Sequence, residues 1–136
     1  MNLINQQDDF TCGVACAAMV AGVPFESALA EAAGFIKVNG MGSREMGTLL
    51  RKLGVRFTRK LFPELRRTVP HIVVAPSLNV VGGLHYIVVD LSNGVVEVYD
   101  PQRGRPGKQY YRHRSDDENG VALTAYAEVI RIDGAR

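Results

Sequence analysis

A cysteine, a histidine and an aspartate stand in this order in the sequence, at Cys12, His85 and Asp100. These side-chain types can supply a thiol nucleophile, a base that takes its proton, and a carboxylate that orients the imidazole. Attack on an amide carbonyl also needs hydrogen-bond donors for the oxygen that becomes negative. The backbone N–H of Cys12 offers one donor, and the side chain of Gln6 or Gln7 offers another. The set therefore fits thiol-dependent amide hydrolysis.

The surroundings of Cys12 favour a reactive thiol. An Ala-rich run begins at Cys12, and Thr11 before it is a suitable N-cap, so the pattern predicts a helix from Cys12 to Ala21. A helix N-terminus and a nearby imidazolium both lower the pKa of a thiol. We expect Gly13 to let a substrate approach the backbone without a side chain in the way. Cys16 lies one turn further along and is predicted to be a buried packing residue.

The elements that must position these residues change in character at Gly54. Before it, apolar spacing near 3.6 predicts helices at 12–21, at 25–33 and, after a Ser43 cap, at 44–53. After it, a period near 2 predicts strands at 55–58, within 71–78, at 84–92, at 95–100 and at 127–132. Residues 101–119 are predicted to form one long irregular loop. The fold class is α+β, with N-terminal helices packed on a C-terminal antiparallel sheet in a single domain over residues 1–136.

The predicted hairpin connects the histidine to the aspartate. Asn93-Gly94 is a strong turn signal, so strands 84–92 and 95–100 should be antiparallel neighbours. His85 near the start of one strand and Asp100 at the end of the other then lie at the same end of the ladder. His71 and His113 have no acidic residue in such a register, and we interpret them as structural or exposed side chains.

Composition excludes several classes of protein. The apolar share of 46% and the charged share of 22% are those of a globular protein, and a net charge of +2 is too small to predict a nucleic-acid partner. No run approaches the ~20 apolar residues of a membrane span, and no Lys or Arg before Lys37 could begin a secretory signal, which predicts a cytoplasmic chain. The basic segment Arg103–Arg114 is predicted to border the substrate cleft and to favour an acidic peptide or partner.

Other site chemistries fit the residues less well. A zinc site built from Cys12, Cys16 and His85 lacks a fourth ligand, and Gly40-Met41-Gly42 lacks the context of a phosphate loop, so we expect no metal and no cofactor. A peptidase is the simplest use of the cysteine, histidine and aspartate. The same residues can also release ammonia from a glutamine side chain or pass the acyl group to an amine. A peptide-binding module without catalysis is a further alternative, although a binder has no need of all three residues.

The pattern as a whole resembles one family, the papain-like bacteriocin-processing cysteine peptidases, which cut leader peptides after a double-glycine site, often as the N-terminal domain of an export transporter. The resemblance spans residues 6 to about 104 and rests on Gln6, Cys12-Gly13 before an Ala-rich helix, His85-Tyr86 before an apolar strand, and Asp100-Pro101 with Gly104 beyond. It implies a reduced papain-like fold with Cys12 as nucleophile, His85 as general base and acid, and Asp100 as its orienting residue.

The resemblance also bears on the oxyanion hole and on partners. It favours Gln6 over Gln7, because the family's glutamine stands six residues before its cysteine, as Gln6 does before Cys12. Thr11 departs from the pattern, since the family more often has an acidic or amide residue there. No transporter segment follows in this sequence. The resemblance therefore predicts a peptide or protein substrate, with a partner transporter or secretion system acting in trans.

Overall fold

The structure is a computed structural model, and it describes residues 1–8, 11–34, 41–60, 69–76, 84–90, 97–101, 111–112, 121–122 and 128–135. Within these residues three helices come first, and seven strands follow. In chain order the elements are α1 (Cys12–Ala21), α2 (Phe25–Glu31), α3 (Ser43–Lys52), β1 (Val55–Lys60), β2 (His71–Pro76), β3 (Leu84–Asp90), β4 (Glu97–Tyr99), β5 (Tyr111–Arg112), β6 (Val121–Ala122) and β7 (Glu128–Ala135).

The helices occupy the predicted ranges with small shifts at their ends. α1 ends where Gly22 adopts a left-handed φ of 69°, a conformation that glycine takes without steric cost. α2 ends at Glu31, two residues before the predicted end. Ser43 is the first residue of α3 and the N-cap position is Gly42, so the prediction that Ser43 caps this helix is wrong by one position. Gly54, at a φ of 76°, turns the chain from α3 into β1.

Five strands form an antiparallel sheet in the order β1-β7-β2-β3-β4. β7 lies between β1 and β2, so the last of the described strands joins the edge strand β1 to the rest of the sheet. β3 and β4 are antiparallel neighbours as the hairpin prediction requires, while the Asn93-Gly94 turn itself lies outside the described residues. The predicted α+β class, with helices first and an antiparallel sheet after them, is confirmed.

A second, two-stranded sheet was not expected. β5 and β6 pair in parallel, and β5 lies within the 101–119 segment that was predicted to be irregular throughout. Each of these strands has two residues, which is too short to leave a period-2 pattern in the sequence.

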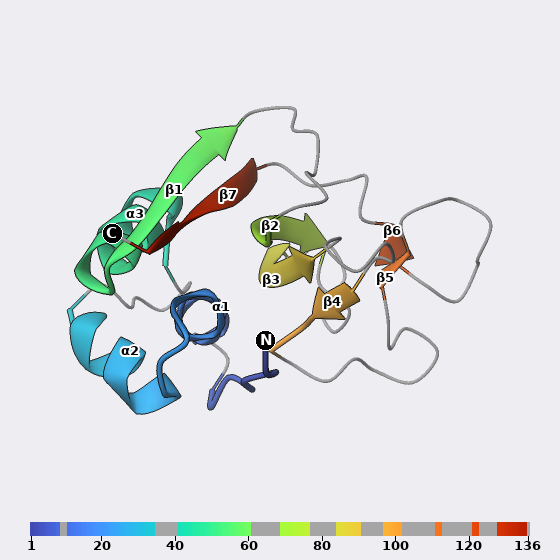
Figure 1. The fold of residues 1–136 in the computed structure, drawn as a ribbon. Helices are drawn as coiled ribbons and strands as arrows, with labels where there is room; N and C mark the ends of the chain where they lie inside the picture. Colours follow the sequence, from blue (N-terminus) through green and yellow to red (C-terminus); the bar gives the residue numbers. More distant parts are fainter. Residues whose placement is uncertain are drawn as a thin grey trace.

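The core places α1 at the centre of the molecule. α1 packs against β3 on one side and against α2 and α3 on the other (Figure 1). Its residues from Gly13 to Met19 are all buried, which explains why the helix is apolar around its whole circumference. The core cluster includes Val14 and Ala18 of α1, Met46 and Leu50 of α3, and Ile72, Val88 and Ile130 of the sheet. This packing fixes the first turn of α1 against the start of β3.

Among the described residues, none of the helices is by itself long and apolar enough to cross a membrane. The pair α1 and α2, bent by 114° at the break between them, satisfies length and composition together.

Candidate active site

Cys12 is the first residue of α1, and its thiol lies in a mostly buried position facing the start of β3. Burial by itself would raise the pKa of this thiol. A hydrogen bond with His85 and the charge of its imidazole outweigh that effect, and the backbone N–H groups of Tyr86 and Gly13 add to them, so that the pKa of Cys12 is lowered. Cys12 therefore has the electrostatic environment of a thiolate rather than that of a buried thiol.

The imidazole of His85 lies between the thiol and a carboxylate. Its Nε2 is 2.7 Å from Oδ1 of Asp100, which leaves Nδ1 as the nitrogen for Cys12. Burial would lower the pKa of His85, whose side chain is only 6% exposed. The hydrogen bonds to Asp100 and Cys12, together with their negative charges, outweigh burial and raise the pKa of His85 to about 9. The charged form of the imidazole is thus stabilised, and the same contact favours ionisation of the Cys12 thiol.

The β3–β4 hairpin sets the distance between His85 and Asp100. Val88 pairs with Tyr99, so Asp100 follows directly after the last residue of β4 and lies diagonally across from His85. Side chains two positions apart on facing strands lie within reach of each other. The hairpin register inferred from the sequence thus brings the two side chains together in the structure.

A strap at residues 6–8 runs past the start of α1. Thr11 is 3% exposed, and its Oγ1 accepts hydrogen bonds from the backbone N–H of Gln7 at 3.1 Å and of Asp8 at 3.3 Å. Thr11 occupies the N-cap position as predicted but makes no side-chain cap bond to the helix. Its hydroxyl instead holds the preceding strap, a role that the cap pattern did not indicate.

The strap places Gln6 next to the residue that follows Asp100. The backbone N–H of Gln6 donates to the carbonyl of Pro101 at 2.8 Å. Its side-chain Nε2 donates to the carbonyl of Asp8 at 2.7 Å, and its Oε1 is buried with no hydrogen-bond partner among the described residues. Gln7, the other candidate, is exposed.

Gly13 serves packing rather than substrate access. It is buried, and a Cβ at this position would lie 2.8 Å from Cε of Met41, 3.1 Å from Cε of Met46 and 3.3 Å from Cδ2 of Tyr86. The side chains of Met41, of Met46 in α3 and of Tyr86 in β3 fill the space that we expected to be open to substrate. The expectation for Gly13 is therefore wrong, because glycine here admits neighbouring side chains to the base of α1.

The remaining candidates lie away from this cluster or outside the described residues. Cys16 is fully buried, and burial raises its pKa well above the ordinary thiol value, with the charges of Cys12 and Asp100 acting in the same direction. His71 is buried at the opposite end of the β2–β3 ladder, where it pairs with Val89. His113 and most of Arg103–Arg114, including the two ends of that segment, are not among the described residues.

Comparison with known proteins gives similarity in structure but not in sequence. No protein-family model matches the chain, and no curated protein matches it significantly. A crystal structure of the peptidase domain of Streptococcus ComA, a bifunctional ABC transporter involved in a quorum-sensing pathway, aligns with a TM-score of 0.64 at 17% identity over 98% of each chain. A double-glycine motif protease from an AMS/PCAT transporter, in complex with the leader peptide, aligns with a TM-score of 0.57 at 19% identity, over 76% of this chain and 75% of that one. The chain thus has the fold of these peptidase domains, and the resemblance inferred from its sequence is confirmed at the level of the fold.

Proposed function

We propose that this chain is a cysteine peptidase, acting as one domain through Cys12, His85 and Asp100. The observation that carries the proposal is the buried imidazole of His85, which hydrogen-bonds both the Cys12 thiol and, at 2.7 Å, the Asp100 carboxylate. Packing alone does not require an ionisable pair such as Cys12 and His85 at the start of a helix. Perturbed pKa values of this kind, together with matched geometry, are typical of nucleophile and base pairs.

The proposed reaction begins with the thiolate of Cys12, which adds to the carbonyl carbon of a peptide bond. The electron pair of the carbonyl moves to its oxygen, and the backbone N–H of Cys12 donates a hydrogen bond to that oxyanion. The His85 imidazolium then gives its proton to the leaving amine, which departs as the acyl-enzyme forms. The neutral imidazole next takes a proton from water, whose oxygen attacks the thioester and releases the acid and the thiolate. Asp100 holds the ring of His85 in place through both steps.

We assign the second oxyanion donor to Gln6. Its backbone bond to Pro101 supports this, because it holds the glutamine next to the Asp100 end of the cluster. A turn of the carboxamide by about 180° breaks the bond from Nε2 to the Asp8 carbonyl and brings Nε2 to the buried place that Oε1 holds in the structure. Because Oε1 cannot donate a hydrogen bond, the carbonyl of Asp8 must then move away from it. The nitrogen at that position would donate to the oxyanion when substrate is bound.

For the substrate, we propose a peptide that is cut after a double-glycine site. The two similar structures support this, since one is described as a double-glycine motif protease in complex with the leader peptide and the other as the peptidase domain of a transporter. We extend the proposal to a partner transporter or secretion system in trans, with cleavage on the cytoplasmic side of the membrane. Both similar structures are peptidase domains, which favours hydrolysis over deamidation, acyl transfer or binding without cleavage.

The test is incubation of the purified chain with a peptide library that includes Gly-Gly sequences, in reductant, with products identified by mass spectrometry. Cys12→Ala is the catalytic variant, and Cys16→Ala is the matched control that removes a thiol one turn away. We expect cleavage by the wild type and by Cys16→Ala but not by Cys12→Ala, with cut sites after Gly-Gly.

Other results would redirect the proposal. A mass change of one dalton without scission would indicate a deamidase, and a product joined to an added amine would indicate a transferase. Cleavage that persists in Cys12→Ala would contradict the assignment of the nucleophile.

A further inference from the structure

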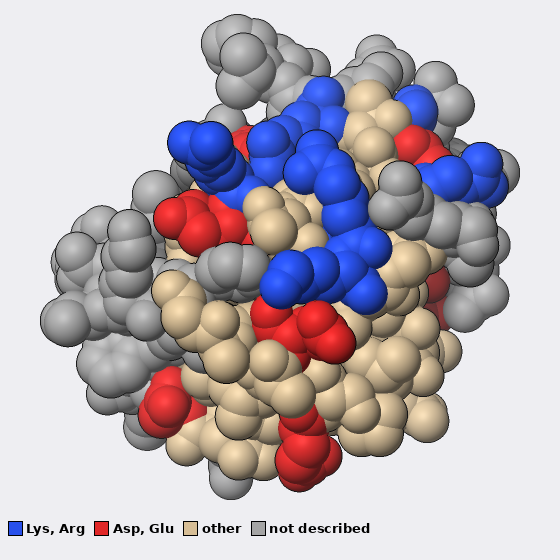
Figure 2. All heavy atoms as spheres, turned by 90° about the vertical axis from the view of Figure 1, so that its left-hand side faces the viewer, with Lys and Arg blue, Asp and Glu red and all other residues tan. Residues whose placement is uncertain are grey.

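A cluster of basic side chains lies at the edge of the sheet, beside α3. Four exposed cationic residues gather there, which we call the basic face: Arg51 and Lys52 in the last turn of α3, and Arg56 and Arg59 on β1. Figure 2 shows Lys and Arg side chains forming a band across this side of the molecule. The Met46 side chain of α3 approaches Gly13 beside the active site, and Arg51 is five residues, roughly 7.5 Å of helix, further on. The basic face is therefore separate from the proposed catalytic residues.

Two guanidinium groups of this face are held by an aromatic ring. Arg51 lies over the ring of Phe57 at 5.2 Å from its centroid, and Arg59 lies at 5.6 Å. Gly47 gives them room, because a Cβ there would lie 3.2 Å from Cζ of Phe57 and would collide with the Arg59 guanidinium. Arg59 also donates to the carbonyl of Ser43. Cation–π contacts such as these fix long side chains in place and reduce the entropy lost when they bind a partner.

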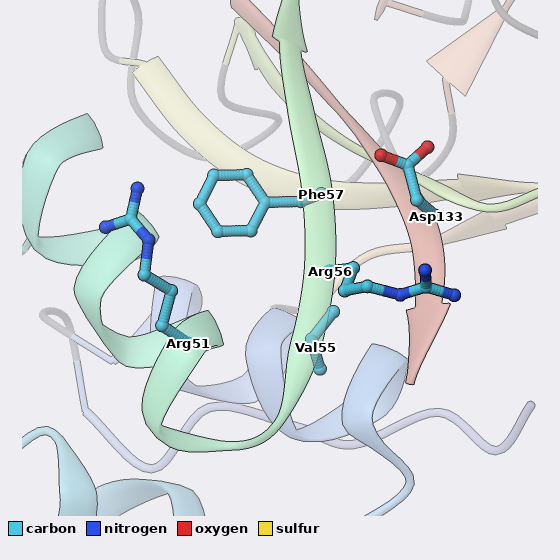
Figure 3. Close-up of a pocket in the computed structure, with 5 residues that line it drawn as sticks. All are labelled: Arg51, Val55, Arg56, Phe57 and Asp133. Carbon is cyan, nitrogen blue, oxygen red and sulfur yellow. The ribbon is translucent and has the colours of Figure 1, made fainter. Parts of the chain in front are cut away.

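A hollow of about 390 Å³ opens on both sides of β1 at the start of the strand. It is lined by Arg51, Val55, Arg56, Phe57 and Asp133. In Figure 3 the ring of Phe57 extends from β1 toward α3, and Arg56 extends to the other side, toward β7 and Asp133. The hollow thus presents one cation on each side of the strand, with apolar surface between them.

Asp133, the acidic residue of the lining, is already compensated. It accepts hydrogen bonds from Oγ1 of Thr58 at 2.6 Å and from Nε of Arg131 at 2.7 Å. Burial raises the pKa of Asp133, but these hydrogen bonds outweigh it, and the charges of Arg131 and Arg56 lower the pKa further. Because Arg131 neutralises this carboxylate, the hollow is positive overall.

The position of β1 in the sheet indicates which conformation a bound peptide segment would have. β1 stands at one end of the strand order, and β7 is the only described strand that pairs with it. An edge strand can accept an extended segment as a further strand, and consecutive side chains of that segment then point to opposite faces of the sheet. A segment with consecutive acidic residues would meet Arg51 on one face and Arg56 on the other.

We propose that the free edge of β1 is the docking edge for an extended acidic segment of a partner protein, whose consecutive carboxylates pair with Arg51 on the α3 face of the sheet and with Arg56 on the opposite face. Nucleic acid fits less well, because the face of Phe57 on which a base would stack lies against guanidinium groups and Asp133 interrupts the positive surface. Docking at this edge is independent of the peptidase chemistry, so it can be tested whatever the outcome of the cleavage experiment.

The experiment measures binding of a blocked, fluorescent oligoglutamate peptide to the full chain at low ionic strength. Arg51→Gln and Arg56→Gln are the test variants. Arg44→Gln removes the same charge from the first turn of α3, outside the hollow, and is the matched control. We expect each test variant to raise Kd at least about fivefold, and the control to change it less than about twofold. An oligoglutamate methylated on alternate amide nitrogens should bind at least about tenfold more weakly, since it cannot form a strand.

Each other outcome overturns the proposal. Absence of saturable binding, or an equal loss in Arg44→Gln, would remove the basic face as the docking site. Equal binding of the methylated peptide would exclude strand addition, and tighter binding of a single-stranded oligonucleotide would replace the acidic segment by nucleic acid. If oligoglutamate competes with a peptide that the enzyme cleaves, the edge belongs to the substrate site and not to a separate partner.

Discussion

Cys12 and Cys16 place the same side chain at two points of one helix, a single turn apart, in two different environments. Cys12 opens α1 and has His85 and two backbone N–H groups around its sulfur, so its pKa is lowered although the thiol is mostly buried. Cys16 is fully buried, and its pKa is raised well above the ordinary value. Burial alone thus produces an inert thiol, whereas an imidazole partner held at the helix start makes a thiol reactive.

The largest difference in activity is expected when each of the two thiols is removed in turn. Cys12→Ala should reduce kcat for peptide cleavage by on the order of 10⁴-fold or more, because no other group in the cluster can form the acyl-enzyme. Cys16→Ala should leave kcat within about twofold, since its sulfur only fills core space. Steady-state kinetics on one cleaved peptide measures both. A similar loss in the two variants would mean that the cysteines share a structural role.

The carboxylate that supports His85 should have the next largest effect. Asp100→Asn removes the charge that raises the pKa of His85, so that pKa should fall from about 9 and the alkaline limb of the activity profile should move to lower pH. With less imidazolium present, the pKa of Cys12 should rise and the contrast with Cys16 should shrink. We expect kcat near neutral pH to fall roughly 10²-fold. An unchanged alkaline limb in the kcat/KM profile would show that Asp100 does not control the imidazole.

The hydrogen bonds that hold the strap to Thr11 can be removed without changing Cys12, His85 or Asp100. Thr11→Val replaces the hydroxyl that accepts from the backbone N–H of Gln7 and Asp8 with a methyl group of similar size. The strap that carries Gln6 should loosen, and kcat should fall about tenfold while KM changes little. Thr11→Ser, which keeps the acceptor, is the matched control and should retain activity. Equal kinetics for the valine and serine variants would argue against a role for the strap.

The smallest expected effects are changes in stability when each of the two cysteines is replaced by serine. Cys16→Ser places a hydroxyl in a site of zero exposure among the α1 core residues, which should lower the free energy of unfolding by about 1–3 kcal/mol. Cys12→Ser, at the partly exposed start of the helix, should change it by less than about 1 kcal/mol. Urea denaturation of both variants measures the two values. A larger loss of unfolding free energy in Cys12→Ser than in Cys16→Ser would contradict the assignment of Cys16 as the core thiol.

The sequence predicted the cluster well, because its positions depend on local patterns. An Ala-rich run with a preceding N-cap residue placed Cys12 at a helix start, and the hairpin register brought His85 to Asp100. These inferences needed only the periods of helices and strands and a short turn signal. The order of the three helices and of the strands of the five-stranded sheet followed from the same periods, whereas β5 and β6 did not.

The parts that could not be predicted depend on contacts between distant segments. The insertion of β7 between β1 and β2 leaves no local mark, because any apolar strand could occupy that place. The role of Gly13 depends on where the Met41 and Met46 side chains end, and that of Thr11 on how the strap folds back. In each case the residue type is compatible with several structural roles, and the tertiary packing determines which one it has.

The reactivity of Cys12 as a low-pKa nucleophile can be measured by site-resolved alkylation of Cys12 and Cys16 with iodoacetamide as a function of pH. The products are read by mass spectrometry in the wild type and in His85→Gln. The lowered pKa predicts that Cys12 is alkylated rapidly, with a midpoint below the ordinary thiol value, and that Cys16 stays unmodified in the folded chain. In His85→Gln the midpoint for Cys12 should move upward, toward that of a free thiol. A Cys12 that reacts no faster than free cysteine, or whose midpoint does not change without His85, would contradict the account.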